Sequence, residues 1–122
     1  MRKLPVLTAA VLVVAGCATV PSGPREMRPA EQVALGRRLT ADLCGGCHST
    51  GGRGASPNRI APAFRDLHQR MDVEMLGEGL ATGLLTGHPA MPVFRLEPYE
   101  VVSIIRYLRS IQPRGSQVRS SR

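Results

Sequence analysis

Two cysteines and a histidine form the motif with the clearest chemistry. Cys44 and Cys47 are separated by two glycines, and His48 follows directly. Two thiols at this spacing can add to the two vinyl groups of one haem, and the adjacent imidazole can then bind the iron. The pattern therefore predicts one covalently bound haem c, with Cys44 and Cys47 as attachment points and His48 as an iron ligand.

Three other uses of the same cysteines remain as alternatives. A redox-active dithiol usually opens a helix after a strand, and no strand pattern precedes Cys44. A zinc site would need further ligands, and the chain has no second cysteine pair. A disulfide between Cys44 and Cys47 would close a very small loop.

The second axial position of the iron is assigned to Met91. This methionine lies in an irregular segment, residues 86–92, whose glycine and two prolines turn and stiffen the backbone. A rigid loop can hold a thioether sulfur against iron, and this soft ligand raises the reduction potential. His88 in the same segment is the rival ligand, and simple filling of the loop is the other use of Met91.

Other residues of these types are assigned no role at the iron. Met71 and Met75 are expected to pack in the core, as methionines on helices usually do. His68 is expected at the surface.

Three segments carry the apolar spacing of amphipathic helices, residues 30–43, 72–84 and 97–111. Pro98 suits a first helical position, and Pro113 ends the last helix. No alternating strand pattern of useful length appears, so the sequence predicts an all-α domain. The residues that carry the spacing are Leu35, Leu39 and Leu43, then Val73, Leu76, Leu80 and Leu84, then Val101, Ile104, Ile105, Leu108 and Ile111.

The N-terminus has the pattern of an export signal over residues 1–16. A basic start precedes a short apolar run, and small residues follow. Val14–Cys17 resembles a bacterial lipobox, which implies a lipid on Cys17; ordinary signal cleavage is the alternative. Ala18 resembles the outer-membrane sorting pattern, so the expected location is the periplasmic face of a bacterial membrane, with the outer membrane favoured over the inner.

The rest of the chain divides into three parts. Residues 17–29 are predicted to be the lipidated cysteine and a flexible linker, 30–111 the folded domain, and 112–122 a disordered basic tail. Most of the net charge of +7 lies outside the domain, which has nine arginines against eight acidic residues. Nucleic acid is therefore not an expected partner. Aromatic residues make up only 3% of the chain, which favours a core built around a large apolar cofactor.

Together these residues resemble the class I cytochromes c, over about residues 31–111. In that family a glycine eight residues before the first haem cysteine lets the first helix cross the last one closely. Gly36 has that place, and Tyr107 with Leu108 matches the usual partner. Thr40 departs from the family, which usually has an aromatic residue there.

The resemblance also extends to the ligands of the iron. It implies that Pro62 offers its carbonyl to His48 and so orients it. The Met91–Pro92 pair looks like the end of the family's methionine ligand loop. The implied fold is the small cytochrome c fold, three main helices and loops wrapped around one haem.

The expected function is one-electron transfer, with the iron cycling between Fe(II) and Fe(III), and the chain is not expected to be an enzyme. No acid–base constellation for chemistry on a small molecule is visible. The alternative is a peroxidase-like or gas-sensing cytochrome in which the methionine ligand is displaced. Redox proteins of a respiratory or dehydrogenase chain are the expected partners.

Overall fold

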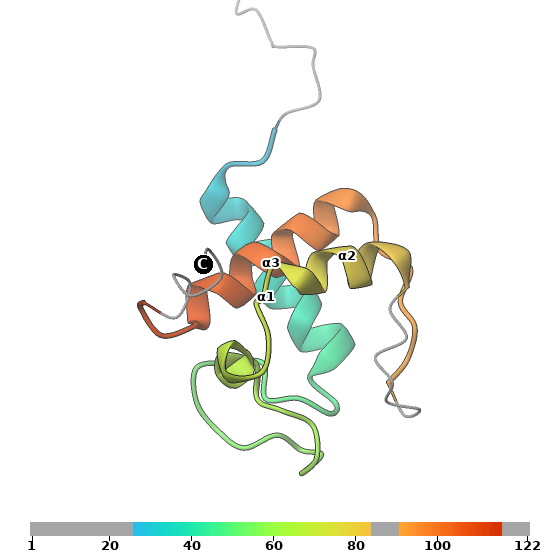
Figure 1. Ribbon diagram of the computed structural model, residues 1–122. Helices are drawn as coiled ribbons and strands as arrows, with labels where there is room; N and C mark the ends of the chain where they lie inside the picture. The colour runs from blue at the N-terminus through green and yellow to red at the C-terminus, as the bar shows by residue number, and fades with distance from the viewer. Residues whose placement is uncertain (1–25, 84–90, 116–122) are drawn as a thin grey trace, which may run out of the picture.

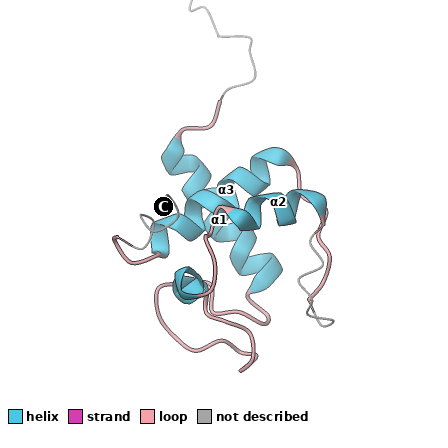
Figure 2. Cartoon of the chain, viewed as in Figure 1, coloured by secondary structure: helices cyan, strands magenta, loops and turns pink. Residues whose placement is uncertain are grey.

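The computed structural model describes residues 26–83 and 91–115, which fold into helices joined by loops (Figure 1). The elements are α1 (Pro29–Cys44), the 3-10 helix η1 (Phe64–Gln69), α2 (Met75–Thr82) and α3 (Pro98–Ile111). Figure 2 shows no strand in these two segments, which confirms the prediction of an all-α fold. No helix within them is long and apolar enough to cross a membrane.

The two long helices begin in the same way. Each has a proline in its first turn, and the backbone N–H of the residue before the helix donates to the side chain of a glutamate three positions later. In α3 the Glu97 N–H donates to Glu100 Oε2 at 2.9 Å. These local contacts explain why the predicted starts of both helices lie within one residue of the observed ones.

Helices α1 and α3 cross at Gly36 with almost no space between their backbones. A Cβ added to Gly36 would lie 1.9 Å from the Ser103 carbonyl oxygen and 2.8 Å from Tyr107 Cβ. The polar side chains buried nearby are satisfied within their own helices. Thr40 Oγ1 donates toward the Gly36 and Arg37 carbonyls at 3.0 Å each, and Ser103 Oγ donates to the Tyr99 carbonyl at 2.7 Å. Small residues therefore permit the close approach.

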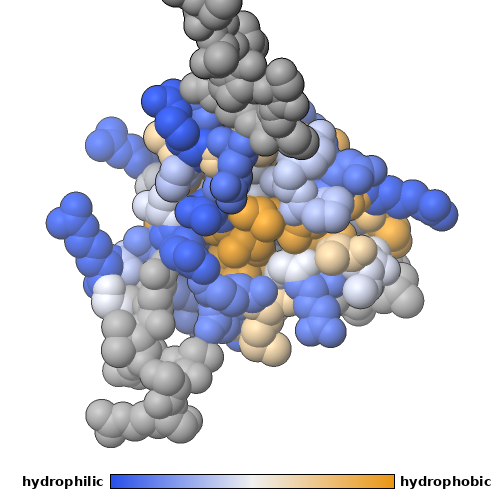
Figure 3. All heavy atoms as spheres, turned by 90° about the horizontal axis from the view of Figure 1, so that it is seen from above, coloured by the Kyte–Doolittle hydropathy of each residue, from blue (hydrophilic) through white to orange (hydrophobic). Residues whose placement is uncertain are grey.

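Helix α2 and η1 complete the core against α3. Gly77 of α2 faces Ile105, whose Cγ1 would lie 3.6 Å from an added Cβ. Arg109 Nε donates to Glu74 Oε1 at 2.6 Å, which ties the approach to α2 to the last turn of α3. Figure 3 shows apolar side chains gathered in the centre of one face with hydrophilic ones around them. The buried core cluster consists of Phe64, Leu67, Val73, Ile104, Tyr107 and Leu108.

The prediction for the middle helix was partly wrong. Helix α2 begins at Met75 rather than at residue 72, because the chain before it forms turns. In these turns the Met75 N–H donates to the Asp72 carbonyl, and the Leu76 N–H donates to the Val73 carbonyl. Gly83, which follows α2, has a φ of 78°, a left-handed conformation that ends helices readily. Leu84 lies outside the described residues.

Four side chains lie elsewhere than expected. Met71 and Met75 are exposed, Met75 to 70%, because α2 packs on α3 through Gly77 and its leucines instead. His68 is only partly exposed, since it is hydrogen-bonded to the end of α3. Gln112 is buried, so the domain extends past the predicted boundary at Ile111.

Candidate functional site

The Cys44–His48 motif is a tight turn at the end of α1. Cys44 is the last residue of the helix, and its carbonyl accepts hydrogen bonds from the Cys47 N–H at 3.1 Å and the His48 N–H at 2.9 Å. The Gly45 N–H donates to the Ala41 carbonyl at 3.2 Å, so the helical pattern runs into the turn. The two thiols and the imidazole are thus presented together by one short, hydrogen-bonded segment.

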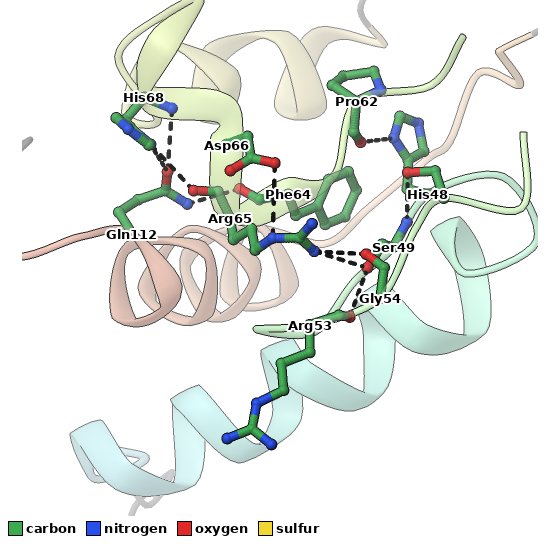
Figure 4. A network of polar contacts seen from close by, with 11 residues as sticks. His48, Ser49, Arg53, Gly54, Pro62, Phe64, Arg65, Asp66, His68 and Gln112 are labelled. Carbon is green, nitrogen blue, oxygen red and sulfur yellow. Dashed lines mark hydrogen bonds and ion pairs between the residues drawn. The ribbon is translucent and has the colours of Figure 1, made fainter. Parts of the chain in front are cut away.

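The imidazole of His48 is held from two sides. Its Nδ1 lies 2.8 Å from the Pro62 carbonyl oxygen, and its ring centroid lies 4.7 Å from that of Phe64 (Figure 4). A carbonyl can only accept, so Nδ1 carries the proton, and in the neutral ring Nε2 then has a lone pair available for a metal. The contact implied by the family resemblance between Pro62 and His48 is therefore present.

The two cysteines have different surroundings, and neither is joined in a disulfide. Cys47 is exposed, whereas burial raises the pKa of the Cys44 thiol to about 11. A redox-active dithiol depends on a thiolate with a lowered pKa. Cys44 has the opposite shift, which argues against that alternative.

The loop after the motif is held by a polar network around Ser49. The Ser49 N–H donates to Ser56 Oγ at 2.9 Å, and Ser49 Oγ donates to the Arg53 carbonyl at 3.1 Å. Arg65 reaches across from η1, and its Nη1 donates to the Gly54 carbonyl at 2.8 Å and to Ser49 Oγ at 3.3 Å (Figure 4). No sequence motif marks these residues, and the contact that closes the network joins Arg65 to Ser49, 16 positions away.

Further backbone contacts connect this loop to the rest of the molecule. The Asn58 N–H donates to the Cys47 carbonyl at 3.1 Å, and the Phe64 N–H donates to the Ser49 carbonyl at 2.9 Å. From α3, the Tyr107 hydroxyl donates to the Thr50 carbonyl at 2.7 Å. The segment that supports His48 is thus fixed to both η1 and α3.

Met91 lies on a different segment from the other predicted site residues. It is half-buried and precedes α3 by a short stretch whose Leu96 packs against the core. An added Cβ on Gly83 would lie 3.2 Å from Val93 Cγ1, so the chain ends on either side of residues 84–90 approach each other. His88 and Cys17 lie outside the described residues.

The described residues contain no cluster of three or more His, Cys, Asp or Glu side chains that could hold a metal ion. The fold and the site define a small all-α domain with one turn that presents two thiols and an imidazole with a free Nε2 lone pair. This donor set fits a prosthetic group that is attached by two thioethers and ligated through its metal.

Comparison with known families agrees with this class. The family model described as cytochrome c matches residues 33–112, most of the chain, and the chain belongs to the cytochrome c family. Its cofactor is therefore covalently bound haem c, and electron carriage is the general activity of the family. No curated protein and no solved structure matched the chain.

Proposed function

We propose that the chain is a mono-haem, class I cytochrome c that carries single electrons while tethered to a membrane. The observation that carries this proposal is the 2.8 Å contact between His48 Nδ1 and the Pro62 carbonyl. It fixes the tautomer in which Nε2 can bind iron, and a hydrogen bond at the other ring nitrogen makes an imidazole a stronger donor.

Each residue of the motif has a distinct role in this proposal. Cys44 and Cys47 would hold the haem through thioethers to its two vinyl groups, with each S–H adding across a vinyl so that no other group is lost. His48 Nε2 would bind the iron, with Pro62 orienting the imidazole and Phe64 restricting rotation of its ring. When bound, the haem iron supplies a centre that gains and loses one electron.

Met91 is the proposed second axial ligand. Its position next to Pro92, on a stretch whose Leu96 packs against the core, supports a sulfur held in place. With His48 and Met91 both bound to the iron, the protein would exclude small molecules from the metal and would limit rearrangement between oxidation states. His88 is the rival ligand, and a peroxidase-like or gas-sensing activity would follow if Met91 were displaced easily.

Spectroscopy of the purified holoprotein tests the ligand assignment. In Met91→Ala the weak far-red sulfur-to-iron band of the ferric form should disappear, and carbon monoxide should bind the ferrous form rapidly. His88→Ala is the matched control and should leave both properties unchanged. A spectrum that changes only in His88→Ala would contradict ligation by Met91.

The attachment of haem is tested separately. After denaturation and extraction with acidified organic solvent, the pigment should remain with the polypeptide of the unmodified chain. In Cys44→Ala or Cys47→Ala the remaining cysteine should retain the pigment through a single thioether bond. In the double variant the pigment should be lost. Release of the pigment from the unmodified chain would contradict attachment through this motif.

The proposed tether is a lipid on Cys17. Several acyl chains, each worth about 0.8 kcal/mol per buried methylene, give stable anchoring. The linker before α1 would reach at most roughly 40 Å from the bilayer. The proposal places the domain at the periplasmic face, with the outer membrane favoured, beside redox partners of a respiratory or dehydrogenase chain.

Mass spectrometry of the mature N-terminal peptide should find diacylglycerol on Cys17, and Cys17→Ser should release the protein from membranes. An unmodified, soluble wild type would contradict the tether.

A further inference from the structure

Gln112, just after α3, uses the whole hydrogen-bonding capacity of its amide within the protein. Its Nε2 donates to the Phe64 carbonyl at 2.8 Å and to the Leu108 carbonyl at 2.9 Å. Its Oε1 lies 3.1 Å from the backbone N of His68 and 3.2 Å from the Nδ1 of the same residue. A side-chain amide has two N–H donors and an oxygen that can accept two hydrogen bonds. Only this orientation of the Gln112 amide satisfies all four partners. Gln112 is also buried.

These contacts hold η1 at both of its ends. The Phe64 carbonyl belongs to the first residue of η1, and His68 is in its last turn. Figure 4 shows the Gln112 amide lying between these two residues. A short 3-10 helix has little stability of its own, so this clamp acts together with the burial of Phe64 and Leu67 to keep η1 in place.

The start of η1 is also the support of His48. Phe64 places its ring 4.7 Å from the imidazole, and Pro62, two residues earlier, provides the carbonyl 2.8 Å from Nδ1. The Phe64 residue therefore contacts Gln112 through its carbonyl and His48 through its ring. Phe64 is therefore the single residue that connects Gln112 to the imidazole of His48.

We propose that Gln112 is a positioning residue for the haem ligand His48, acting through η1. The proposal rests on the proposed function, because it assumes that His48 binds the haem iron. Without the clamp, η1 shifts more freely and the His48–Pro62 hydrogen bond opens more often. The imidazole then donates less strongly to iron, which destabilises the ferric state more than the ferrous state and raises the reduction potential.

The test uses holoprotein carrying Gln112→Met, which retains most of the side-chain volume but none of the polar contacts. NMR of the holoprotein measures exchange of the His48 Nδ1–H with solvent, and redox titration measures the potential. We expect exchange on the order of tenfold faster, because the hydrogen bonds that hold η1 are lost, and a higher potential. Ser110→Ala is the matched control: Ser110 Oγ donates at 2.6 Å to the Tyr107 carbonyl in the same end of α3 and to no residue of η1 in the described structure.

Each outcome decides one question. Faster exchange and a higher potential in Gln112→Met, with Ser110→Ala unchanged, support the proposal. Unchanged exchange and potential in a Gln112→Met protein that retains covalent haem overturn it, and so do equal changes in both variants, which would mean general loosening of the helix end. Loss of covalent haem from the unmodified protein would instead contradict the proposed function.

Discussion

The crossing of α1 and α3 and the loop over residues 45–64 are stabilised by different means. At the crossing, two backbones meet at a glycine, and the polar side chains there bond within their own helices. In the loop, side chains from other parts of the chain bind backbone carbonyls, as Arg65 and Tyr107 do. The crossing depends on the absence of a side chain at Gly36. The loop depends on hydrogen bonds that the side chains of Arg65 and Tyr107 donate to its backbone carbonyls.

The largest effect should come from filling the crossing. Gly36→Val places a branched side chain where the Ser103 carbonyl and Tyr107 already lie. Neither backbone can move without separating α1 from α3, so we expect a loss of about 3 kcal/mol or more in unfolding free energy. Denaturant unfolding of the holoprotein measures it. Gly52→Ala, with no atom within 4 Å of an added Cβ, should change stability little. Equal losses in both variants would contradict the special role of the crossing.

Cutting the network of the loop should have a smaller, more local effect. Arg65→Met removes the donors to Ser49 and the Gly54 carbonyl, which we expect to cost about 1–3 kcal/mol. Amide hydrogen exchange should increase in residues 49–54 before it increases in α1. Arg53→Met is the control, because Arg53 takes part in this network through its carbonyl. Uniform exchange across the domain would show that loop and helices do not respond separately.

Tyr107 belongs to both regions, so its two contributions can be separated. Tyr107→Phe retains the ring beside Gly36 but removes the hydroxyl that donates to the Thr50 carbonyl. We expect a loss of about 1 kcal/mol, with faster exchange in the loop only. Thermal unfolding and hydrogen exchange of the holoprotein check this. A loss as large as that of Gly36→Val would mean that the hydroxyl also maintains the crossing.

The smallest effect should be a gain. Gly77 lies in α2, where an added Cβ would make ordinary contact with Ile105 at 3.6 Å. Gly77→Ala should therefore raise the unfolding free energy by about 0.5–1 kcal/mol through helix propensity. Destabilisation, measured by the same denaturant unfolding, would show that the approach of α2 to α3 is as strict as that of α1.

The sequence predicted the parts of the molecule that depend on local pattern. The spacing of Leu35, Leu39 and Leu43 marked α1, Pro98 marked the start of α3, and the spacing from Cys44 to His48 marked the site. The cytochrome resemblance added the Gly36–Tyr107 crossing and the contact of Pro62 with His48. Ligation by His48 and Met91 remains a prediction.

The parts that sequence analysis missed depend on contacts between distant residues. Gln112 meets Phe64 48 positions away, and no periodicity signals a single amide between two helices. It was assigned to the tail because its neighbours are polar. Met75 was assigned to the core from its residue type and its place near a predicted helix, although the direction in which a short helix presents a side chain depends on what that helix packs against.

The haem-attachment motif begins at the last residue of α1, so the position of Cys44 depends on how the crossing holds this helix. Eight residues separate Gly36 from Cys44, a helical distance of about 12 Å. If α1 pivots at its point of closest contact, a tilt of about 5° moves the Cys44 end by roughly 1 Å. The close packing at Gly36 then limits how far Cys44, the first attachment point, can move relative to α3.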